Sequence, residues 1–398
     1  MKKQSYLALA FLSLLALPLH AQVSFSDGKN SFEIGAALFS YYNYRFYPAD
    51  ENNHKKNNFV LRNAQLDFEG RVGRNIEFKA QYNFAKAGLN DNAAGSAEAP
   101  ALMDAWVRIL NRKGPNVKIG YFVLPYSRTS MCGYRDMAFI QRAIVGKGDI
   151  YSRRDLGIQF DKTLLNQRLN LYAGIYSGQG EAVTSALYGG DNDASGNPEF
   201  LARVDYSWPV RYRYSEIDAV HVPIPMFQVG INGRTANRRT PYTSDYAIKT
   251  VDGSRTVTGA DFSFQYRGLS LQAEYQQMYV RPRDGKTLVY TDADPSTGVA
   301  TLRDWRGKTD HFWARGYMAQ ANYHVGPLKS VFAVRYDAFN ANDLRLFDES
   351  RNLSFAYNYM IDGFRSVIKL QYFWRLKKDY VNGPTDDQIR LGWQYVFK

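Results

Sequence analysis

Basic side chains gather in one polar stretch, residues 124–153, between two segments that have the residue pattern of β-strands. The cations of this stretch and its end are Arg128, Arg135, Arg142, Lys147, Arg153 and Arg154. Within the stretch they are opposed only by Asp136 and Asp149. A guanidinium group offers paired N–H donors that match phosphate or carboxylate oxygens, and cations around a narrow passage favour anions. The grouping therefore predicts an anion-binding site.

Other cations fall on the polar faces of neighbouring segments. The candidates for lining a water-filled interior are Lys79, Arg108, Lys118, Arg335 and Lys369. The alternative for these residues is a solvated wall in which they pair with Glu77, Asp104 or Asp337. The alternative for the cations of 124–153 is a solvated loop, or pairing with carboxylates, lipopolysaccharide or a neighbouring subunit.

Arg62 is a separate case, because it alternates with Val60, Ala64 and Leu66 on the apolar face of its segment. Two arrangements would accommodate a charge there. The side chain could extend along the apolar surface to a polar interface. Alternatively, a β-bulge could turn it toward the polar face.

Catalytic chemistry finds little support in the sequence. The histidines beyond residue 21 are His54, His221, His311 and His324, and none belongs to an HExxH motif or a close metal-ligand cluster. No G-x-S-x-G motif is present. Cys132 is the single cysteine, which excludes an intrachain disulfide. We expect no enzyme activity, no catalytic residue, no metal and no cofactor.

The N-terminus indicates export. Lys2 and Lys3 precede a short apolar run from Tyr6 to Leu17, and a small residue, Ala21, follows. This order is typical of a signal peptide over residues 1–21, because the apolar run is too short to span a membrane. We expect residues 22–398 to form one domain, since no linker, low-complexity tract or repeat divides them.

Strict alternation is the main structural signal. From Ile76 to Phe84, apolar residues occupy every second position and Glu77, Lys79, Gln81 and Asn83 the others. A strand separates such residues onto two faces, whereas a helix would mix them. The pattern predicts strands at 31–45, 58–71, 76–85, 101–110, 117–123, 154–161, 168–177, 199–208, 224–233, 256–266, 269–281, 312–324, 328–339, 352–361, 365–376 and 388–397.

The connections between these strands alternate in length. Short ones such as Arg267-Gly268 and Gly326-Pro327 alternate with long polar ones such as 124–153 and 282–311. Short periplasmic turns and long extracellular loops are typical of an outer-membrane barrel, which has an even number of strands, here about 16. Residues 209–223 break the rule, because a short turn is expected there, and we interpret them as an insertion.

Bulk composition supports a membrane barrel. No run of 18 apolar residues follows the signal, which excludes helical membrane spans, and the mean hydropathy of −0.43 is compatible with strands that face lipid at every second residue. Aromatic residues make up 15% of the chain, as interface girdles require. A secreted β-sandwich or propeller is the alternative fold. The net charge of +12 favours anionic solutes or lipid headgroups, and no nucleic-acid partner is expected after export.

Several motifs resemble the phosphate-selective porin O and P family in their order and spacing. They are Phe59–Gly70 (FVLRNAQLDFEG), Leu102–Val107 (LMDAWV), Val117–Tyr126 (VKIGYFVLPY), Phe139, Arg142 and Arg153–Gly157 (RRDLG). The resemblance implies a trimeric barrel of about 16 strands, a third loop folded into the pore, and anion selectivity from basic residues at the constriction. The chain departs from the family at Asn63, where a further arginine would extend the basic row.

The combined prediction is an all-β, transmembrane antiparallel barrel in the outer membrane of a Gram-negative bacterium, with 124–153 as its pore-folding loop. It would pass small anions, phosphate among the candidates, by passive diffusion, and its other partners would be membrane lipid and lipopolysaccharide. A general porin whose basic residues only tune conductance is one alternative. A structural or adhesive surface barrel with ligand-binding loops is another.

Overall fold

A computed structural model of the chain describes residues 23–46, 57–86, 101–146, 153–178, 180, 196–212, 214–238, 253–283, 288–290, 302–304, 311–340, 343, 349–376 and 387–397. Its long strands are β2 (Ser31–Arg45), β3 (Asn57–Val72), β4 (Ile76–Asn83), β5 (Ala101–Ile109), β6 (Asn116–Val123), β7 (Arg154–Leu164), β8 (Leu169–Tyr176), β9 (Glu199–Trp208), β10 (Met226–Arg238), β11 (Gly253–Tyr266), β12 (Leu269–Pro282), β15 (Phe312–Val325), β16 (Ser330–Asn340), β17 (Glu349–Asp362), β18 (Ser366–Arg375) and β19 (Gln388–Phe397).

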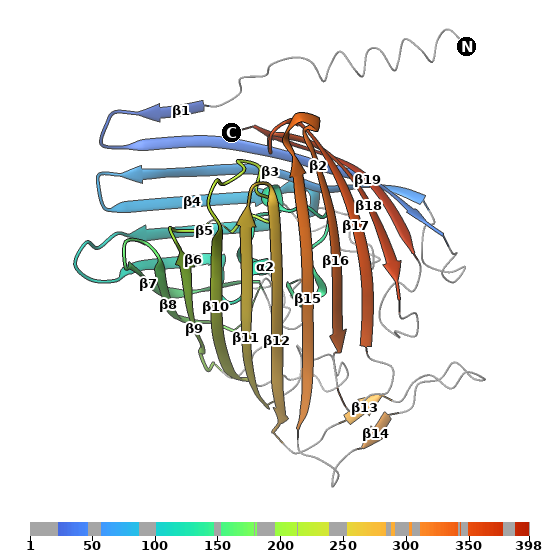
Figure 1. Cartoon of the computed structure of the whole chain (residues 1–398). Coiled ribbons are helices and arrows are strands. Elements are labelled where there is room, and N and C mark those ends of the chain that lie inside the picture. The colour runs from blue at the N-terminus through green and yellow to red at the C-terminus, as the bar shows by residue number, and fades with distance from the viewer. Residues whose placement is uncertain are drawn as a thin grey trace.

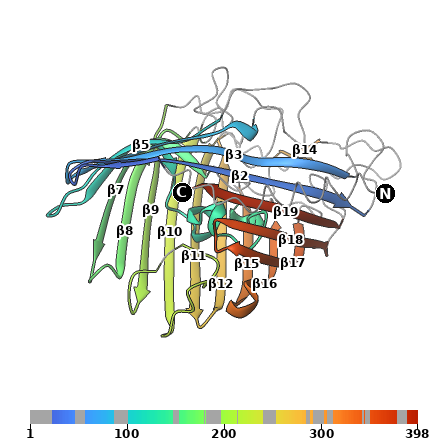
Figure 2. The same ribbon diagram turned by 90° about the horizontal axis from the view of Figure 1, so that it is seen from above.

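These strands form a closed antiparallel barrel of 16 strands (Figures 1 and 2). Each long strand pairs with the next one along the chain, and β19 pairs with β2 from Gln388↔Arg45 to Phe397↔Ala36, which closes the ring. Closure leaves no open edge among them, so every strand can satisfy its backbone groups inside a membrane. All the predicted strands are present, and the predicted fold class is confirmed.

The alternation of the sequence becomes an inside and an outside. In β9, Leu201, Arg203 and Asp205 are buried toward the interior, while Phe200 and Val204, at the alternate positions, are exposed on the outer surface. The outer surface is therefore apolar and suited to lipid, whereas the interior carries polar and charged groups that pair with one another. No helix among the described residues is long and apolar enough to cross a membrane.

The alternation of connection lengths is also present. At one end, Arg267 and Gly268 join β11 to β12 with φ angles of +47° and +88°, a tight hairpin in which glycine removes the strain of the second residue. At the opposite end lies the small hairpin of β13 (Leu288–Tyr290) and β14 (Leu302–Asp304) (Figure 1). We call these ends the short-turn end and the long-loop end.

The sequence did not predict three short strands. These are β13, β14 and β1 (Val23–Ser26). β1 pairs with Ser31–Ile34 of β2, on the edge that β19 leaves unpaired beyond Phe397. Strands of three or four residues carry too little alternation to be recognised in a sequence.

Residues 124–146 of the connection between β6 and β7 fold into the barrel, and we call them, together with Arg153, the inner loop. It contains α2 (Arg128–Met131) and two 3₁₀ turns, Tyr134–Asp136 and Ile144–Gly146. The side chain of Ser127 begins α2 by accepting a hydrogen bond from the Ser130 backbone N–H at 3.1 Å. Figure 1 labels α2 within the ring of strands.

Candidate functional site

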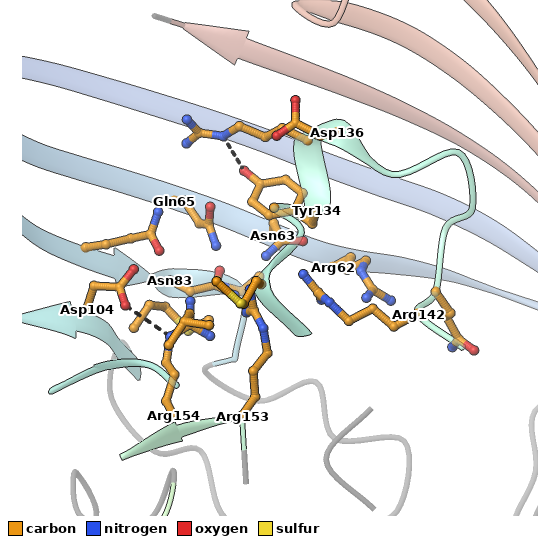
Figure 3. A pocket seen from close by; sticks show the side chains of 18 of the residues that line it. Arg62, Asn63, Gln65, Asn83, Asp104, Tyr134, Asp136, Arg142, Arg153 and Arg154 are labelled. Atoms are coloured by element: carbon orange, nitrogen blue, oxygen red, sulfur yellow. Dashed lines mark hydrogen bonds and ion pairs between the residues drawn. The ribbon is translucent and has the colours of Figure 1, made fainter. Parts of the chain in front are cut away.

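A cavity of about 640 Å³ lies between the inner loop and the wall formed by β2 to β6. Its cationic lining residues are Arg62, Lys79, Arg135, Arg142, Arg153 and Arg154. The acidic residues of the lining are Asp104 and Asp136 (Figure 3). The lining also includes the polar side chains of Asn63, Gln65, Gln81 and Asn83. We call this space the basic cavity.

Four of the predicted constriction residues, Arg135, Arg142, Arg153 and Arg154, meet in this cavity, together with the predicted wall residue Lys79. Lys147 lies outside the described residues. Arg128 is not part of the lining and is 2% exposed on the other side of the inner loop.

Backbone carbonyls hold two of the arginines in place. Arg142 donates from Nη2 to the Cys132 carbonyl at 2.6 Å and from Nε to the Thr129 carbonyl at 3.2 Å. Arg153 donates from Nε to the Ser130 carbonyl at 2.6 Å. A carbonyl orients a guanidinium without cancelling its charge. Burial, together with the nearby charge of Arg62, lowers the pKa of Arg142 to about 10, so the group remains charged at neutral pH.

Other cations of the cavity are paired with carboxylates. Arg135 forms an ion pair with Asp67, which also accepts a hydrogen bond from Gln81. Arg154 reaches Asp104 at 3.2 Å, as the dashed line in Figure 3 marks. Lys79 lies 3.4 Å from Glu69. These pairs reduce the positive field that the number of cations alone would suggest.

Arg62 reaches the cavity through a β-bulge. Asn63 pairs with Phe39 and Leu61 pairs with the adjacent Ser40, so Arg62 is an extra residue in β3. The bulge turns its side chain inward, which was one of the two arrangements expected. Figure 3 shows Arg62 beside Arg142. Within the described part of the chain, its guanidinium has no hydrogen bond or ion pair.

The other side of the inner loop is fixed to the barrel. Arg335 of β16 donates to the Gln141 carbonyl at 2.9 Å, and Lys369 of β18 donates to the Met137 carbonyl at 2.7 Å. The carboxylate of Glu274 on β12 accepts the Thr129 backbone N–H at 2.9 Å. The structure therefore places the predicted wall cations Arg335 and Lys369 under the inner loop, where they anchor it.

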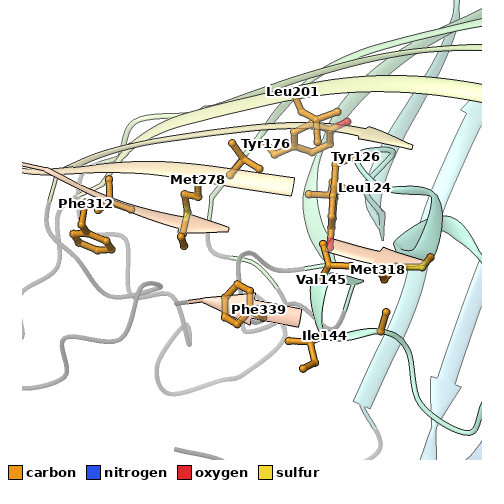
Figure 4. Packing of buried hydrophobic residues seen from close by; sticks show 14 of the residues in the cluster. Leu124, Tyr126, Ile144, Val145, Tyr176, Leu201, Met278, Phe312, Met318 and Phe339 are labelled. Carbon is orange, nitrogen blue, oxygen red and sulfur yellow. The ribbon is translucent and has the colours of Figure 1, made fainter. Parts of the chain in front are cut away.

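Apolar side chains complete this attachment. Both ends of the inner loop insert residues into one buried cluster inside the barrel (Figure 4). The loop contributes Leu124, Tyr126, Ile144 and Val145, and the wall contributes Tyr176, Leu201, Met278, Met318 and Phe339. Such contacts exclude water from that half of the interior. The open space is consequently displaced toward β2–β6.

The remaining predicted wall cations lie nearer the short-turn end. Arg108 pairs with Asp161 and, at 3.3 Å, with Glu77, which confirms that an ion pair with Glu77 forms. The ammonium of Lys118 lies 4.2 Å from the ring centre of Trp106 and 4.3 Å from that of Phe122. Neither cation belongs to the lining of the basic cavity. Among the described residues no group of three His, Cys, Asp or Glu side chains could hold a metal ion.

A closed barrel of 16 strands with an apolar exterior, a polar interior and an inward loop defines the class of outer-membrane porins, which are channels rather than enzymes. A sequence model of one porin family, described as phosphate-selective porin O and P, matches residues 35–397. The chain belongs to this family, as its motifs had suggested.

Solved porins share the fold at low sequence identity. The OmpF of Salmonella typhi, in complex with daunomycin, is 11% identical with a TM-score of 0.62, and the match covers 94% of this chain and 100% of that one. An anion-selective porin from Comamonas acidovorans is 12% identical with a TM-score of 0.55, covering 93% and 100%. The trimer form of OmpT from Vibrio cholerae is 9% identical with a TM-score of 0.55, covering 92% and 99%. No curated protein sequence matches the chain.

Proposed function

We propose that this porin passes small anions, phosphate among them, by passive diffusion through the basic cavity. The observation that carries the proposal is the pair Arg62 and Arg142, which line the same cavity while neither forms an ion pair with a described carboxylate. Because the loop carbonyls orient Arg142 and the bulge orients Arg62, both charges are held in place before an anion arrives.

The expected attraction between these cations and an anion is weak enough for the anion to leave again. Two opposite unit charges about 4 Å apart attract each other by roughly 1 kcal/mol in water and by about 4 kcal/mol at an effective dielectric constant near 20. Two such cations attract an anion without holding it permanently, and Arg153 offers a further contact along the lining. Several weak sites in sequence allow an ion to leave after it has entered.

We also propose how the chain is exported, oriented in the membrane and assembled. Residues 1–21 would direct export and be removed, and residues 22–398 would form a barrel whose short-turn end faces the periplasm. We include a homotrimer in the lipopolysaccharide-containing membrane, in keeping with the trimer form of the structurally similar OmpT. Native mass spectrometry of the detergent-extracted protein would test the assembly.

The main experiment measures the reversal potential of the purified protein in a planar bilayer under a KCl gradient. The wild type should show chloride preference, and added phosphate should reduce the chloride current. Arg62→Gln should lower the chloride-to-potassium permeability ratio by about twofold to fivefold, since a partly exposed charge contributes up to about 1 kcal/mol.

The matched control is Arg365→Gln, which removes the same charge from the exposed turn between β17 and β18 and should leave the ratio unchanged. Cation preference in the wild type would contradict the proposal. An unselective channel would support the second candidate, a general porin, which the ion pairs of Arg135 with Asp67 and Arg154 with Asp104 favour.

A further inference from the structure

The connection from β9 to β10, residues 209–225, starts at the short-turn end, and its middle part, residues 214–219, folds into the barrel. The sequence marks it as an insertion, and the structure shows where it goes. Glu216, Ile217 and Asp218 are between 1% and 6% exposed, inside the ring of strands. The inner loop enters from the long-loop end, so two connections from opposite ends meet within the barrel.

Glu216 is the point where they meet. One of its carboxylate oxygens accepts the Ala138 backbone N–H of the inner loop at 2.8 Å and the Gln320 side-chain amide of β15 at 3.0 Å. Its own backbone N–H donates to the Asp136 carbonyl of the inner loop at 3.0 Å. Its carbonyl accepts from the Asn322 side chain of β15 at 2.7 Å. This residue therefore joins the inner loop to the barrel wall.

Neighbouring residues strengthen the junction. The Ser215 carbonyl accepts from Nη2 of Arg128 in the inner loop at 3.3 Å and from the Gln272 amide of β12 at 3.2 Å. The guanidinium of Arg128 also lies 4.6 Å from the ring centre of Tyr212. Ile217 packs in a buried cluster with Phe139 of the inner loop. The contact thus combines hydrogen bonds with apolar packing.

The base of the segment is attached separately. The Asp218 carboxylate accepts the backbone N–H groups of Val222 and Gly268, and the Asp218 backbone N–H donates to Ser270. Nε2 of His221 lies 2.9 Å from Nδ1 of His324 on β15. Because the segment is bonded to the barrel wall at its base and to the inner loop at its tip, it opposes movement of the inner loop away from the wall.

We propose that the described residues of this connection, 209–212 and 214–225, are a clamp that holds the inner loop in place and confines the open passage to the basic cavity, with Glu216 as the positioning residue. The clamp acts on the width and steadiness of the channel. It does not depend on which ion is preferred, so it stands apart from the proposed anion selectivity.

Removal of the Glu216 carboxylate would leave the Ala138 N–H and the Gln320 amide without their partner in a buried place, which favours detachment of the loop. Cys132 offers a direct report of that detachment. It is the only cysteine of the chain, lies in the inner loop and is 2% exposed. Burial also raises the pKa of its thiol, so in the clamped protein it should react slowly with maleimide.

The experiment compares wild type, Glu216→Ala and the control Asp362→Ala in detergent and in planar bilayers. In Glu216→Ala, Cys132 should be labelled at least about tenfold faster than in wild type. The reason is that loss of a buried hydrogen-bonding group favours local opening of the inner loop. This variant should also show larger single-channel conductance and more current noise. Asp362→Ala removes a carboxylate from an exposed turn and should match wild type in all three measurements.

Wild-type labelling and conductance in Glu216→Ala would overturn the clamp, and so would faster labelling with unchanged conductance. Heat-modifiable migration on a gel verifies that the barrel has formed. If Glu216→Ala does not assemble, Asn322→Ala removes one wall contact of the clamp and should shift labelling and conductance in the same direction. No change in that assembled variant would equally overturn the proposal.

Discussion

The inner loop has two sides that use the same residue types in opposite ways. On the side of β2–β6, Arg62 and Arg142 line a cavity, and neither forms an ion pair with a described carboxylate. On the side of β9–β18, Arg203 and Lys369 are at most 2% exposed and are bound to carboxylates or loop carbonyls. A charge can therefore serve transport or attachment, and the difference lies in what its neighbours supply.

The comparison also explains why the cavity lies on one side of the inner loop. Apolar packing and buried hydrogen bonds hold the inner loop against one wall, so the cavity lies against the other. If the loop were held equally on both sides, the barrel would be filled. The attached side should thus control stability and channel width, while the cavity side should control ion preference.

The largest effect is expected from Arg203→Met, on the attached side. Arg203 makes a two-point contact with Asp261 at 2.6 and 2.9 Å and also lies 3.2 Å from Asp205, with all three side chains buried. Loss of the guanidinium leaves buried carboxylates without their counter-ion, a change that costs about 3–5 kcal/mol. Urea unfolding in detergent, followed by gel mobility, should show a clearly lower midpoint.

Arg62→Met is the matched variant on the cavity side, because its guanidinium has no hydrogen-bonding partner among the described residues. Its urea midpoint should stay close to wild type, even though its ion preference changes. Equal destabilisation by the two variants would remove the distinction between the two sides.

These examples show what the sequence could and could not predict. Alternation is a local property of the sequence, so the strands and the barrel could be predicted from it. The grouping of Arg135, Arg142, Arg153 and Arg154 could be predicted because these residues lie in or next to one connection. The partner of each cation depends on contacts between segments far apart in sequence. Arg128 and Arg142 look equivalent in the sequence, yet only Arg142 lines the cavity.

Two other features could be predicted from the sequence only in part. The apolar face of β3 made Arg62 conspicuous, but a bulge depends on pairing with β2, which a single strand does not reveal. The insertion at 209–223 was recognised by its length, whereas its inward direction was not predicted. Its only local signal is the pair of acidic residues Glu216 and Asp218 beside apolar Ile217, a pattern common in exposed turns as well.

A smaller effect, on selectivity alone, is expected from Asp67→Asn. The buried carboxylate of Asp67 forms an ion pair with Arg135, which lines the basic cavity, so replacing Asp67 with a neutral residue of equal size should leave a further positive charge in the lining. The chloride-to-potassium permeability ratio should rise by about twofold to fivefold, the same interval that a single partly exposed charge gives. Reversal potentials of Asp67→Asn and Arg62→Gln should be measured together, because the permeability ratio should rise in the first variant and fall in the second.

Asp161→Asn is the control for this variant, since Asp161 pairs with Arg108 outside the cavity lining. It should leave the permeability ratio near the wild-type value. A fall in chloride preference after Asp67→Asn would show that Arg135 does not act on the permeating ion.

The smallest effect should come from pH, through the histidine pair at the base of the clamp. The 2.9 Å contact between His221 and His324 needs at least one ring nitrogen that accepts, so it is present when a ring is neutral. The contact is therefore present while at least one ring is neutral, and it is lost as the pH falls and both rings become charged.

The charged groups beside the histidine pair include Asp218 on the clamp and Arg267 and Lys329 on the adjacent turns. Between about pH 8 and pH 5, current noise should increase modestly and Cys132 should react faster than its thiolate fraction predicts. His221→Gln should remove this dependence. If the variant keeps the full pH response, the histidine contact does not hold the clamp, and the attachment must reside in Asp218 and Glu216 alone.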